Sequence, residues 1–244
     1  MQCTLWRATC AHGSGTTLID RERGYETFYF VLYPPPDPSL VCAPLLSRPC
    51  HPNAVEQGGE DLFEFFDQHL EGVDQRTAQE IILGITLPIA YLHNLHICHR
   101  DLKPENILLK QIPGQPIQSS MIQICDFGLC CQKVRPNTKS LSEFCGSPGF
   151  FAPEMVLGGG KYNGLLVDVW SIGCIMLELS LGHDIFCKSW MSAYDFDIIQ
   201  RPSAFEDAIE NAVSRLNLGC MSVEMADFVK QVLVIDPSQR GETL

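Results

Sequence analysis

Two short polar segments of the chain carry the residue types that a phosphoryl transfer requires. The first is His99-Arg100-Asp101-Leu102-Lys103-Pro104-Glu105-Asn106. An aspartate can orient an incoming hydroxyl and accept its proton, a lysine can steady the transferring phosphate, and an asparagine oxygen can ligate magnesium. Asp101, Lys103 and Asn106 are therefore candidate catalytic residues, and Asn106 is also a candidate metal ligand.

The second segment places a carboxylate at the end of a predicted strand. Asp126 comes after a largely apolar predicted strand over 121–124 and precedes Phe127 and Gly128. A hard oxygen ligand at this point suits a magnesium ion that bridges phosphates, so Asp126 is both a catalytic and a metal-ligating candidate. If each segment stood alone, the simpler interpretation would be a solvated polar loop for the first and a turn after a strand for the second. Their order and spacing favour a catalytic site.

Bulk composition restricts the class of protein. The chain has 244 residues, is 45% hydrophobic and carries a net charge of -12 at pH 7. It can bury one sizeable core or two unequal ones, and its charge disfavours nucleic acid and anionic membranes as partners while weakly favouring basic ones. The longest apolar run, Ile81 to Leu92, is too short to span a bilayer. No secretion signal is visible among the first residues, so we expect reduced cysteines and an intracellular, cytoplasmic protein, with a nuclear location left open.

Sequence periodicity predicts a small β-containing segment followed by a large helical region. Residues 25–32 are aromatic and β-branched, which predicts a strand, and the prolines of residues 34–52 predict an irregular connection. Ile82, Ile85, Ile89 and Leu92 recur at steps of three and four and therefore mark the buried face of a helix, with Pro88 inside it. Further predicted elements are a central buried helix over 168–181, helices over 204–216 and 223–234, and a long protruding turn between Leu109 and Met121.

These segments, followed by Ala152-Pro153-Glu154, resemble the eukaryotic protein kinase family, and residues 58–240 are similar to its large lobe. The resemblance implies an α+β fold with a mainly α-helical large lobe and a truncated, small β-containing N-terminal lobe. We expect residues 1–57 to hold the remnant of that lobe with a proline-rich insertion, and residues 58–244 to form the C-terminal lobe. Lys103-Pro104-Glu105 is similar to serine/threonine kinases and implies ATP and Mg²⁺ as cofactors.

The same resemblance implies roles for individual residues. Asp101 would be the catalytic base, Lys103 the phosphate contact, and Asn106 and Asp126 the magnesium ligands. Residues expected to contact the nucleotide are Leu108, as the floor under adenine, with Cys125, Glu60 and Lys103. Residues expected to contact the protein substrate are Glu105, Ser147, Gly149 and Glu178.

Other residues are expected to hold the site in shape. Ser147 would bridge Asp101 and Lys103, Glu154 would form an ion pair with Arg240, and Asp168 would hold the catalytic-loop backbone by hydrogen bonds. The full set with an expected structural role is His99, Phe127, Gly128, Glu154, Asp168 and Arg240.

Arg100, next to the catalytic aspartate, is typical of kinases that are switched on when a phosphorylated loop residue neutralises this arginine. Glu143 stands at the usual acceptor position, so we hypothesise that its carboxylate pairs with Arg100 without modification. The alternative is a solvated loop charge, because one carboxylate carries less charge than a phosphate. Ser140 and Ser142 are alternative phosphorylation sites.

Acidic residues on the expected docking surface predict the substrate. Glu60 or Asp61, then Glu105 and Glu178, resemble the acidic contacts of kinases that prefer basic substrates, including the calcium/calmodulin-dependent group. Arginine forms forked hydrogen bonds with carboxylates, so we expect protein substrates with basic, arginine-containing flanks, and an unidentified regulatory protein. The alternative is ordinary surface charge at Glu60 and Asp61, and an acid satisfied within the core at Glu178.

The N-terminal region departs from the family pattern. Lys103 is the first lysine of the chain, and the glycine-containing residues 12–17 lack the third glycine of a phosphate-covering loop. Two functions therefore remain open. One is an ATP-dependent serine/threonine kinase, and the other is a catalytically weak or inactive kinase-derived module that binds proteins.

Overall fold

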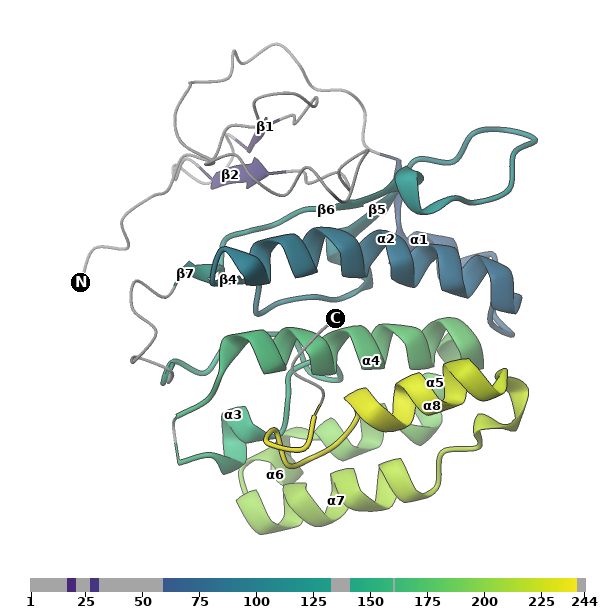
Figure 1. Cartoon of the computed structure of the whole chain (residues 1–244). Coiled ribbons are helices and arrows are strands. Elements are labelled where there is room, and N and C mark those ends of the chain that lie inside the picture. The colour runs from purple at the N-terminus through teal and green to yellow at the C-terminus, as the bar shows by residue number, and fades with distance from the viewer. Residues whose placement is uncertain (1–16, 21–26, 31–58, 133–140, 160, 241–244) are drawn as a thin grey trace.

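The computed structural model describes residues 17–20, 27–30, 59–132, 141–159 and 161–240. The expected proline-rich connection, the boundary between residues 57 and 58, and Ser140 lie outside these residues. Of the predicted strand over 25–32, residues Thr27–Phe30 are described as β2, which pairs antiparallel with β1 (Thr17–Asp20) (Figure 1).

Two small antiparallel sheets frame the polar segments. In the first, β5 (Ile107–Leu109) lies between β3 (Glu60–Asp61) and β6 (Ile122–Ile124). In the second, β4 (Ile97–Cys98) pairs with β7 (Cys131–Gln132). Each polar segment therefore connects a strand of one sheet to a strand of the other: the first lies between β4 and β5 in the chain, and the second between β6 and β7. The turn between β5 and β6 protrudes as predicted and ends in the short 3-10 helix η2 (Ser119–Met121) (Figure 1).

The predicted helix before the first polar segment is confirmed as α2 (Gln75–Asn94). Ile82, Ile85, Ile89 and Leu92 are all buried, and the helix continues through Pro88. The short helix α1 (Leu62–Asp67) precedes it and begins where Asp61 Oδ1 accepts a hydrogen bond of 2.8 Å from the backbone N–H of Glu64. This is an N-cap, which satisfies one of the free amides of the first turn.

The predicted central helix is confirmed as α4 (Gly164–Leu181), which begins earlier than expected because Asn163 caps it by accepting from the backbone N–H of Leu165. In the part of the chain that is described, α4 is the one helix long and apolar enough to cross a membrane, and 89% of it is buried inside the protein. It packs against α2 and α8 (Val223–Val232) and forms the centre of the core (Figure 1). Its apolar composition is accounted for by this burial.

The helices predicted over 204–216 and 223–234 are confirmed, with ends shifted by a few residues. The first is α7 (Pro202–Ser214) and the second is α8. The remaining short elements are η1 (Pro104–Asn106), α3 (Glu154–Leu157), α5 (His183–Ser189), η3 (Met191–Tyr194), α6 (Phe196–Ile199) and η4 (Leu218–Cys220). Below α4, Trp170 Nε1 donates to Tyr194 Oη, and Tyr194 Oη donates to the carbonyl of Phe151. These bonds attach the segment before α3 to the core helix.

Candidate active site

Asp101, Lys103 and Ser147 meet in one hydrogen-bonded group. Ser147 Oγ donates to Asp101 Oδ1 at 2.8 Å and accepts from Lys103 Nζ, also at 2.8 Å. Lys103 Nζ lies 3.5 Å from Asp101 Oδ2. The expected bridge is therefore present. It shows that the Asp101 carboxylate can accept the hydrogen of a serine hydroxyl while the Lys103 ammonium donates to the oxygen of that hydroxyl.

Asn106 connects this group to the neighbouring sheet. Its Nδ2 donates to the Asp101 carbonyl at 2.7 Å and to Asp101 Oδ2 at 3.3 Å, so its Oδ1 remains for another partner. Its backbone carbonyl accepts from the N–H of Cys125 at 3.0 Å, next to the antiparallel pair formed by Ile107 and Ile124. Asp126 follows Cys125 directly. The backbones of the two candidate metal ligands therefore lie close together, at the start of β5 and just after the end of β6.

Asp126 is held in an uncommon backbone conformation. Its φ is 58°, in the left-handed region that L-residues rarely adopt, and its Oδ1 accepts from the N–H of Gly128 at 3.1 Å. Strained residues of this kind cluster at functional sites. The oxygens of Asp126 and Asn106 are the donors that magnesium prefers. No group of three or more His, Cys, Asp or Glu residues with metal-site geometry occurs among the described residues.

His99 is fully buried between the two polar segments. Its Nδ1 accepts from the backbone N–H of Asp101 at 3.3 Å, so we assign the ring proton to Nε2, which donates to the carbonyl of Cys125 at 3.1 Å. Burial lowers the pKa of His99, although Asp168 and the Cys125 carbonyl oppose the shift. The ring also meets Phe127 edge-on, with centroids 4.9 Å apart. A neutral imidazole therefore connects the loop of Asp101 to the segment of Asp126.

Asp168 fixes the backbone of the catalytic loop from within the core helix α4. Its Oδ2 accepts from the N–H of His99 and its Oδ1 from the N–H of Arg100, each at 2.8 Å. Arg100 has a φ of 70°, and these two bonds hold it there. His93 Nε2 lies 2.9 Å from Asp168 Oδ2. His93 is not among the predicted site residues, although its position four residues after Ile89 on the inward face of α2 is a usable signal.

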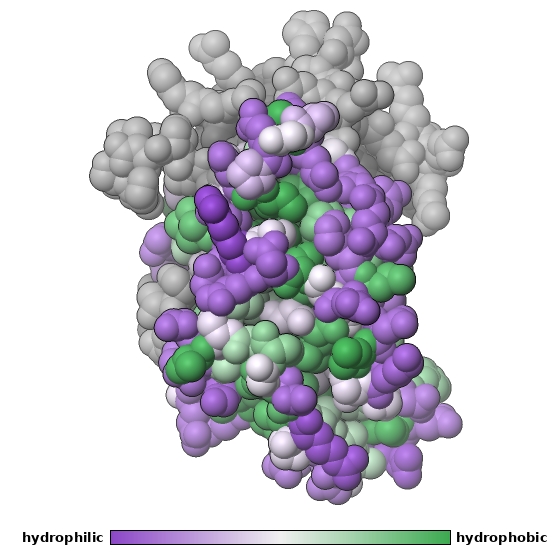
Figure 2. Space-filling view, turned by 90° about the vertical axis from the view of Figure 1, so that its right-hand side faces the viewer, coloured by the Kyte–Doolittle hydropathy of each residue, from purple (hydrophilic) through white to green (hydrophobic). Residues whose placement is uncertain are grey.

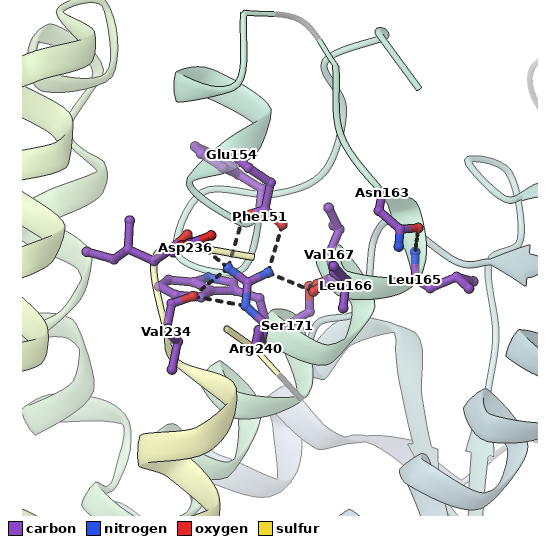
Figure 3. A network of polar contacts seen from close by, with 12 residues as sticks. Phe151, Glu154, Asn163, Leu165, Leu166, Val167, Ser171, Val234, Asp236 and Arg240 are labelled. Carbon is purple, nitrogen blue, oxygen red and sulfur yellow. Dashed lines mark hydrogen bonds and ion pairs between the residues drawn. The ribbon is translucent and has the colours of Figure 1, made fainter. Parts of the chain in front are cut away.

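The ion pair between Glu154 and Arg240 is present and buried (Figure 3). Arg240 Nη1 donates to Glu154 Oε1 at 2.7 Å, and Nη2 donates to Oε2 at 3.0 Å. Arg240 also donates to the carbonyls of Leu166 and Val234, and its guanidinium lies 4.9 Å from the ring centroid of Trp170. The pair connects α3 to α4 and to the segment after α8. It thereby helps to fix the position of the segment before α3, which carries Ser147.

Arg100 and Glu143 approach each other, with Nη2 and Oε2 separated by 3.6 Å. The Glu143 side chain is 76% exposed, so solvent screens this contact. Tyr162, which is not among the predicted site residues, makes shorter bonds: its hydroxyl accepts from Arg100 Nη1 at 3.2 Å and donates to the Glu143 carbonyl at 2.6 Å. Ser142 is exposed on the same loop.

The expected nucleotide contacts lie along the first sheet. Leu108 is half-buried in β5 opposite Asp61, and Cys125 is buried after β6. Burial, with Asp126 and Asp61 nearby, raises the pKa of Cys125 to about 12, so the thiol stays protonated at neutral pH. Glu60 accepts hydrogen bonds from Gln68 at 3.0 Å and Gln111 at 2.6 Å. The nucleotide roles of Leu108, Cys125 and Glu60 stay predictions.

The expected substrate contacts differ in exposure. Glu105 is exposed, whereas Glu178 is 1% exposed and accepts a hydrogen bond at 2.6 Å from His183 Nδ1. Gly149 is buried, has a φ of 89°, and its carbonyl accepts from Trp190 Nε1 at 2.8 Å. An added Cβ at Gly149 would collide with Met191 Sδ, so this position requires glycine. Its contact with substrate stays a prediction.

Comparisons with known proteins agree with this geometry. A family model described as the protein kinase domain matches residues 54–243. The chain is 32% identical over 183 residues to the SNF-related serine/threonine-protein kinase of Rattus norvegicus, covering 75% of this chain and 22% of that protein. It is 32% identical over 195 residues to serine/threonine-protein kinase RAD53 of Saccharomyces cerevisiae, covering 75% and 22%.

A third relative is serine/threonine-protein kinase YPK2/YKR2 of Saccharomyces cerevisiae, which is 36% identical over 169 residues, covering 69% of this chain and 23% of that protein. The matched region is thus less than a quarter of each of these relatives. The family match spans most of the chain and includes both polar segments, α4 and the buried Glu154–Arg240 pair. The chain therefore belongs to the protein kinase family.

Proposed function

We propose that the chain transfers the γ-phosphate of ATP to serine or threonine hydroxyls of protein substrates. The observation that carries this proposal is the Ser147 hydroxyl, which is hydrogen-bonded to both Asp101 and Lys103. The same two side chains can hold a substrate hydroxyl once Ser147 yields one of its bonds. Family membership supports the reaction class.

In this mechanism Asp101 orients the attacking hydroxyl and accepts its proton, and Lys103 faces the phosphate that is transferred. Asn106 Oδ1 and the Asp126 carboxylate would hold magnesium, which supplies charge neutralisation at the phosphates when bound. Buried His99 and Asp168 keep the loop in place without contacting the reactants. Most of the catalysis then comes from positioning and electrostatics.

The substrate class follows from the acids near the site. Glu105 is exposed beside the catalytic loop, and its charge adds to the rise in the pKa of buried Glu178, so the two carboxylates lie near each other. Arginine matches such carboxylates by forked hydrogen bonds, which supports substrates with arginine near the acceptor. The same acidic residues support our proposal that the chain resembles the calcium/calmodulin-dependent group of kinases.

One observation favours a second candidate, a module that binds proteins with little or no catalysis. No lysine precedes Lys103 in the chain, so the phosphate-binding lysine of the family has no counterpart there. Loss of one preorganised electrostatic contact raises a reaction barrier by about 3–4 kcal/mol, which corresponds to a rate loss of roughly 10²–10³. A chain of this kind would keep its fold and protein contacts while its turnover becomes slow.

A thermal shift with Mg²⁺ and ATP tests nucleotide binding directly. A ligand that binds the folded state raises the melting temperature, and binding at 100 times Kd contributes about 2.7 kcal/mol. We expect Mg²⁺ with ATP to raise the melting temperature and Asp126→Asn to abolish the shift. Asp184→Asn, which changes an exposed acid on α5, is the matched control and should leave the shift unchanged. An absent shift in the unchanged chain would favour the protein-binding module.

A further inference from the structure

Two cysteines lie directly opposite each other in the small sheet beside the polar segments. Cys98 on β4 and Cys131 on β7 are Cα partners in this antiparallel pair of strands. Cys98 Sγ donates to the carbonyl oxygen of Cys131, with the two atoms 3.3 Å apart. Both residues are thiols in this structure, and Cys98 is buried while Cys131 is half-buried. Neither thiol has a part in the phosphoryl transfer, so the chemistry of this cysteine pair is a separate question.

The geometry of an antiparallel pair suits a disulfide at this position. Directly opposite residues have Cα atoms about 4.5–5.5 Å apart. Disulfides join Cα atoms that are about 4.4–6.8 Å apart. The side chains of opposite residues also project from the same face of the sheet. Cys98 Sγ already contacts the backbone of Cys131, so the two sulfurs can meet without a displacement of either strand.

Packing around the cysteine pair makes Cys131 the sulfur that solvent reaches first. Cys98 is 1% exposed and lies against Gly164, the first residue of α4. A Cβ added at Gly164 would collide with Cys98 Sγ and crowd Leu141, so the chain is closely packed on this side of Cys98. Cys131 keeps part of its surface exposed. An oxidant in solution therefore meets Cys131, and Cys98 is the thiol that resolves the oxidised product.

We propose that Cys98 and Cys131 are a redox-active pair that a hydroperoxide, ROOH, converts to a disulfide. The peroxide O–O bond breaks as Cys131 Sγ becomes a sulfenic acid, and ROH leaves. Cys98 Sγ then attacks the sulfur of Cys131. The S–S bond forms, and the hydroxyl of the sulfenic acid leaves with the thiol proton of Cys98 as water. Two thiols are oxidised and one peroxide is reduced, so the step balances.

The disulfide closes a covalent ring that contains both polar segments. Asp101, Asn106 and Asp126 all lie between residues 98 and 131 in the chain. Because β4 and β7 are already paired, the bond keeps the two segments in the arrangement that they have. A cross-link also restricts the unfolded chain, and it thereby stabilises the folded one. Oxidation would make this part of the lobe harder to unfold, whether or not the chain has the proposed function.

Two neighbouring cysteines are poorer partners for Cys98. Cys125 is buried, and burial with nearby acids raises its pKa to about 12, so its thiol stays protonated and reacts slowly. Cys130 comes directly before β7 and is one residue out of register with Cys98. Successive side chains of a strand point to opposite faces. Cys130 is half-buried like Cys131, which makes Cys130→Ser the matched control.

Peptide mapping after brief treatment of the folded protein with hydrogen peroxide tests the cysteine pair. Trypsin should release Cys98 on residues 77–100 and Cys131 on residues 111–133. We expect these peptides to be joined, fragmentation of the linked species to assign the bond to Cys98 and Cys131, and dithiothreitol to separate them. The link should persist in Cys130→Ser and vanish in Cys131→Ser. A link through Cys125 or Cys130, or no link at all, would overturn the pair.

Thermal unfolding tests the consequence without any measurement of phosphorylation. We expect the oxidised chain to melt roughly 5–10 °C above the reduced chain, and Cys130→Ser to show the same rise. Cys98→Ala and Cys131→Ser should show none. Cys187→Ser controls for the loss of a remote thiol: β4 and β7 lie on the left in Figure 1, whereas α5, which carries Cys187, lies on the side that Figure 2 turns to the viewer. No rise in the unchanged chain, or an equal rise in Cys131→Ser, would contradict the proposal.

Discussion

At the scale of single residues, the site depends on side chains that never touch the reactants. Asp168 accepts the backbone N–H groups of His99 and Arg100 from inside α4, and it thereby fixes the loop that carries Asp101. Arg100 and Asp126 both have positive φ values, so the two polar segments are bent at strained positions on either side of His99. A strained backbone persists only where the surroundings determine it fully.

Removal of the Asp168 carboxylate should therefore destabilise the protein strongly. Asp168→Ala leaves two buried backbone donors without acceptors, at a cost of about 1–3 kcal/mol each. We expect Asp168→Asn to fall between the unchanged chain and Asp168→Ala, because an amide keeps one acceptor oxygen. Denaturant unfolding gives the free energies directly. Equal stability of the three proteins would show that the loop is held by other contacts.

Replacement of Glu143 should have a small effect. The Arg100–Glu143 contact is 3.6 Å long and Glu143 is 76% exposed, and exposed pairs contribute about 0.2–1 kcal/mol. Glu143→Ala should therefore lower activity by no more than about fivefold, whereas Tyr162→Phe removes two shorter bonds of the same loop and should lower it further. Peptide phosphorylation by the two variants, measured in parallel, checks this order. The reverse order would make Glu143 the main restraint of the loop.

The sequence predicts the site at this scale because the residue types of the polar segments limit their chemistry. The family resemblance adds that Asp101, Lys103 and Ser147 form one group, and they do. The roles of Tyr162 and His183 are not predictable, since a lone tyrosine or histidine is compatible with almost any environment. The partners of Tyr162 are far away in the chain, and the bond of His183 depends on the burial of Glu178. The spacing of residues in the sequence predicts neither of these contacts.

At the scale of elements, the helical lobe is organised around α4. Asp168 on α4 accepts a hydrogen bond from the backbone N–H of Arg100 in the catalytic loop. The carbonyl of Leu166, also on α4, accepts a hydrogen bond from Arg240 in the segment after α8. The Glu154–Arg240 pair has both side chains buried, with two bonds of 2.7 and 3.0 Å. Such a pair is costly to break, because the remaining partner keeps a buried charge without compensation.

Glu154→Ala should lower the free energy of unfolding by about 3–5 kcal/mol, as expected for a broken buried ion pair. The matched control is Asp227→Ala, which removes an exposed ion pair with Lys230 at 3.6 Å and should change stability by less than about 0.5 kcal/mol. Thermal or denaturant unfolding of both variants checks the contrast. A loss of similar size in the two variants would mean that burial does not set the strength of the pair.

Long periodic elements are predictable from the sequence and short ones are not. The apolar face of α2 and the nearly continuous apolar sequence of α4 are sufficient to predict both helices. The short elements α5, η3 and α6 are not predicted, because each is at most 7 residues long and is too short for a periodic pattern. Their positions depend on contacts made by Trp190 and Tyr194. Helix ends are also shifted from their predicted positions, since caps such as Asn163 decide them locally.

At the scale of the whole molecule, two buried ionisable groups set opposite pH dependences. The folded pKa of His99 lies below its usual value, so the stability that neutral His99 contributes is lost as the pH falls below about 6.5. The folded pKa of Glu178 is raised to about 7, so the stability of its protonated form is present at low pH and is lost as the pH rises through 7. Together they favour maximal stability in weakly acidic solution.

Glu178→Gln should therefore stabilise the protein at pH 8 by about 1–3 kcal/mol and have little effect at pH 5. The amide cannot ionise, so the variant avoids the cost of a buried charge. Unfolding by denaturant at the two pH values gives the difference. A variant that is less stable than the unchanged chain at pH 8 would mean that the Glu178–His183 bond outweighs the cost of burial, and that the carboxylate is kept for stability.

The central claim is that Asp101 and Asp126 act on one substrate complex. The most direct test is a single-turnover transfer of labelled phosphate from ATP to an arginine-containing serine peptide, in the unchanged chain and in Asp101→Asn. We predict transfer by the unchanged chain and a loss of about 10²-fold or more in Asp101→Asn, with the thermal shift by Mg²⁺ and ATP retained. Equal transfer rates in the two proteins would contradict the assignment of Asp101 as the base.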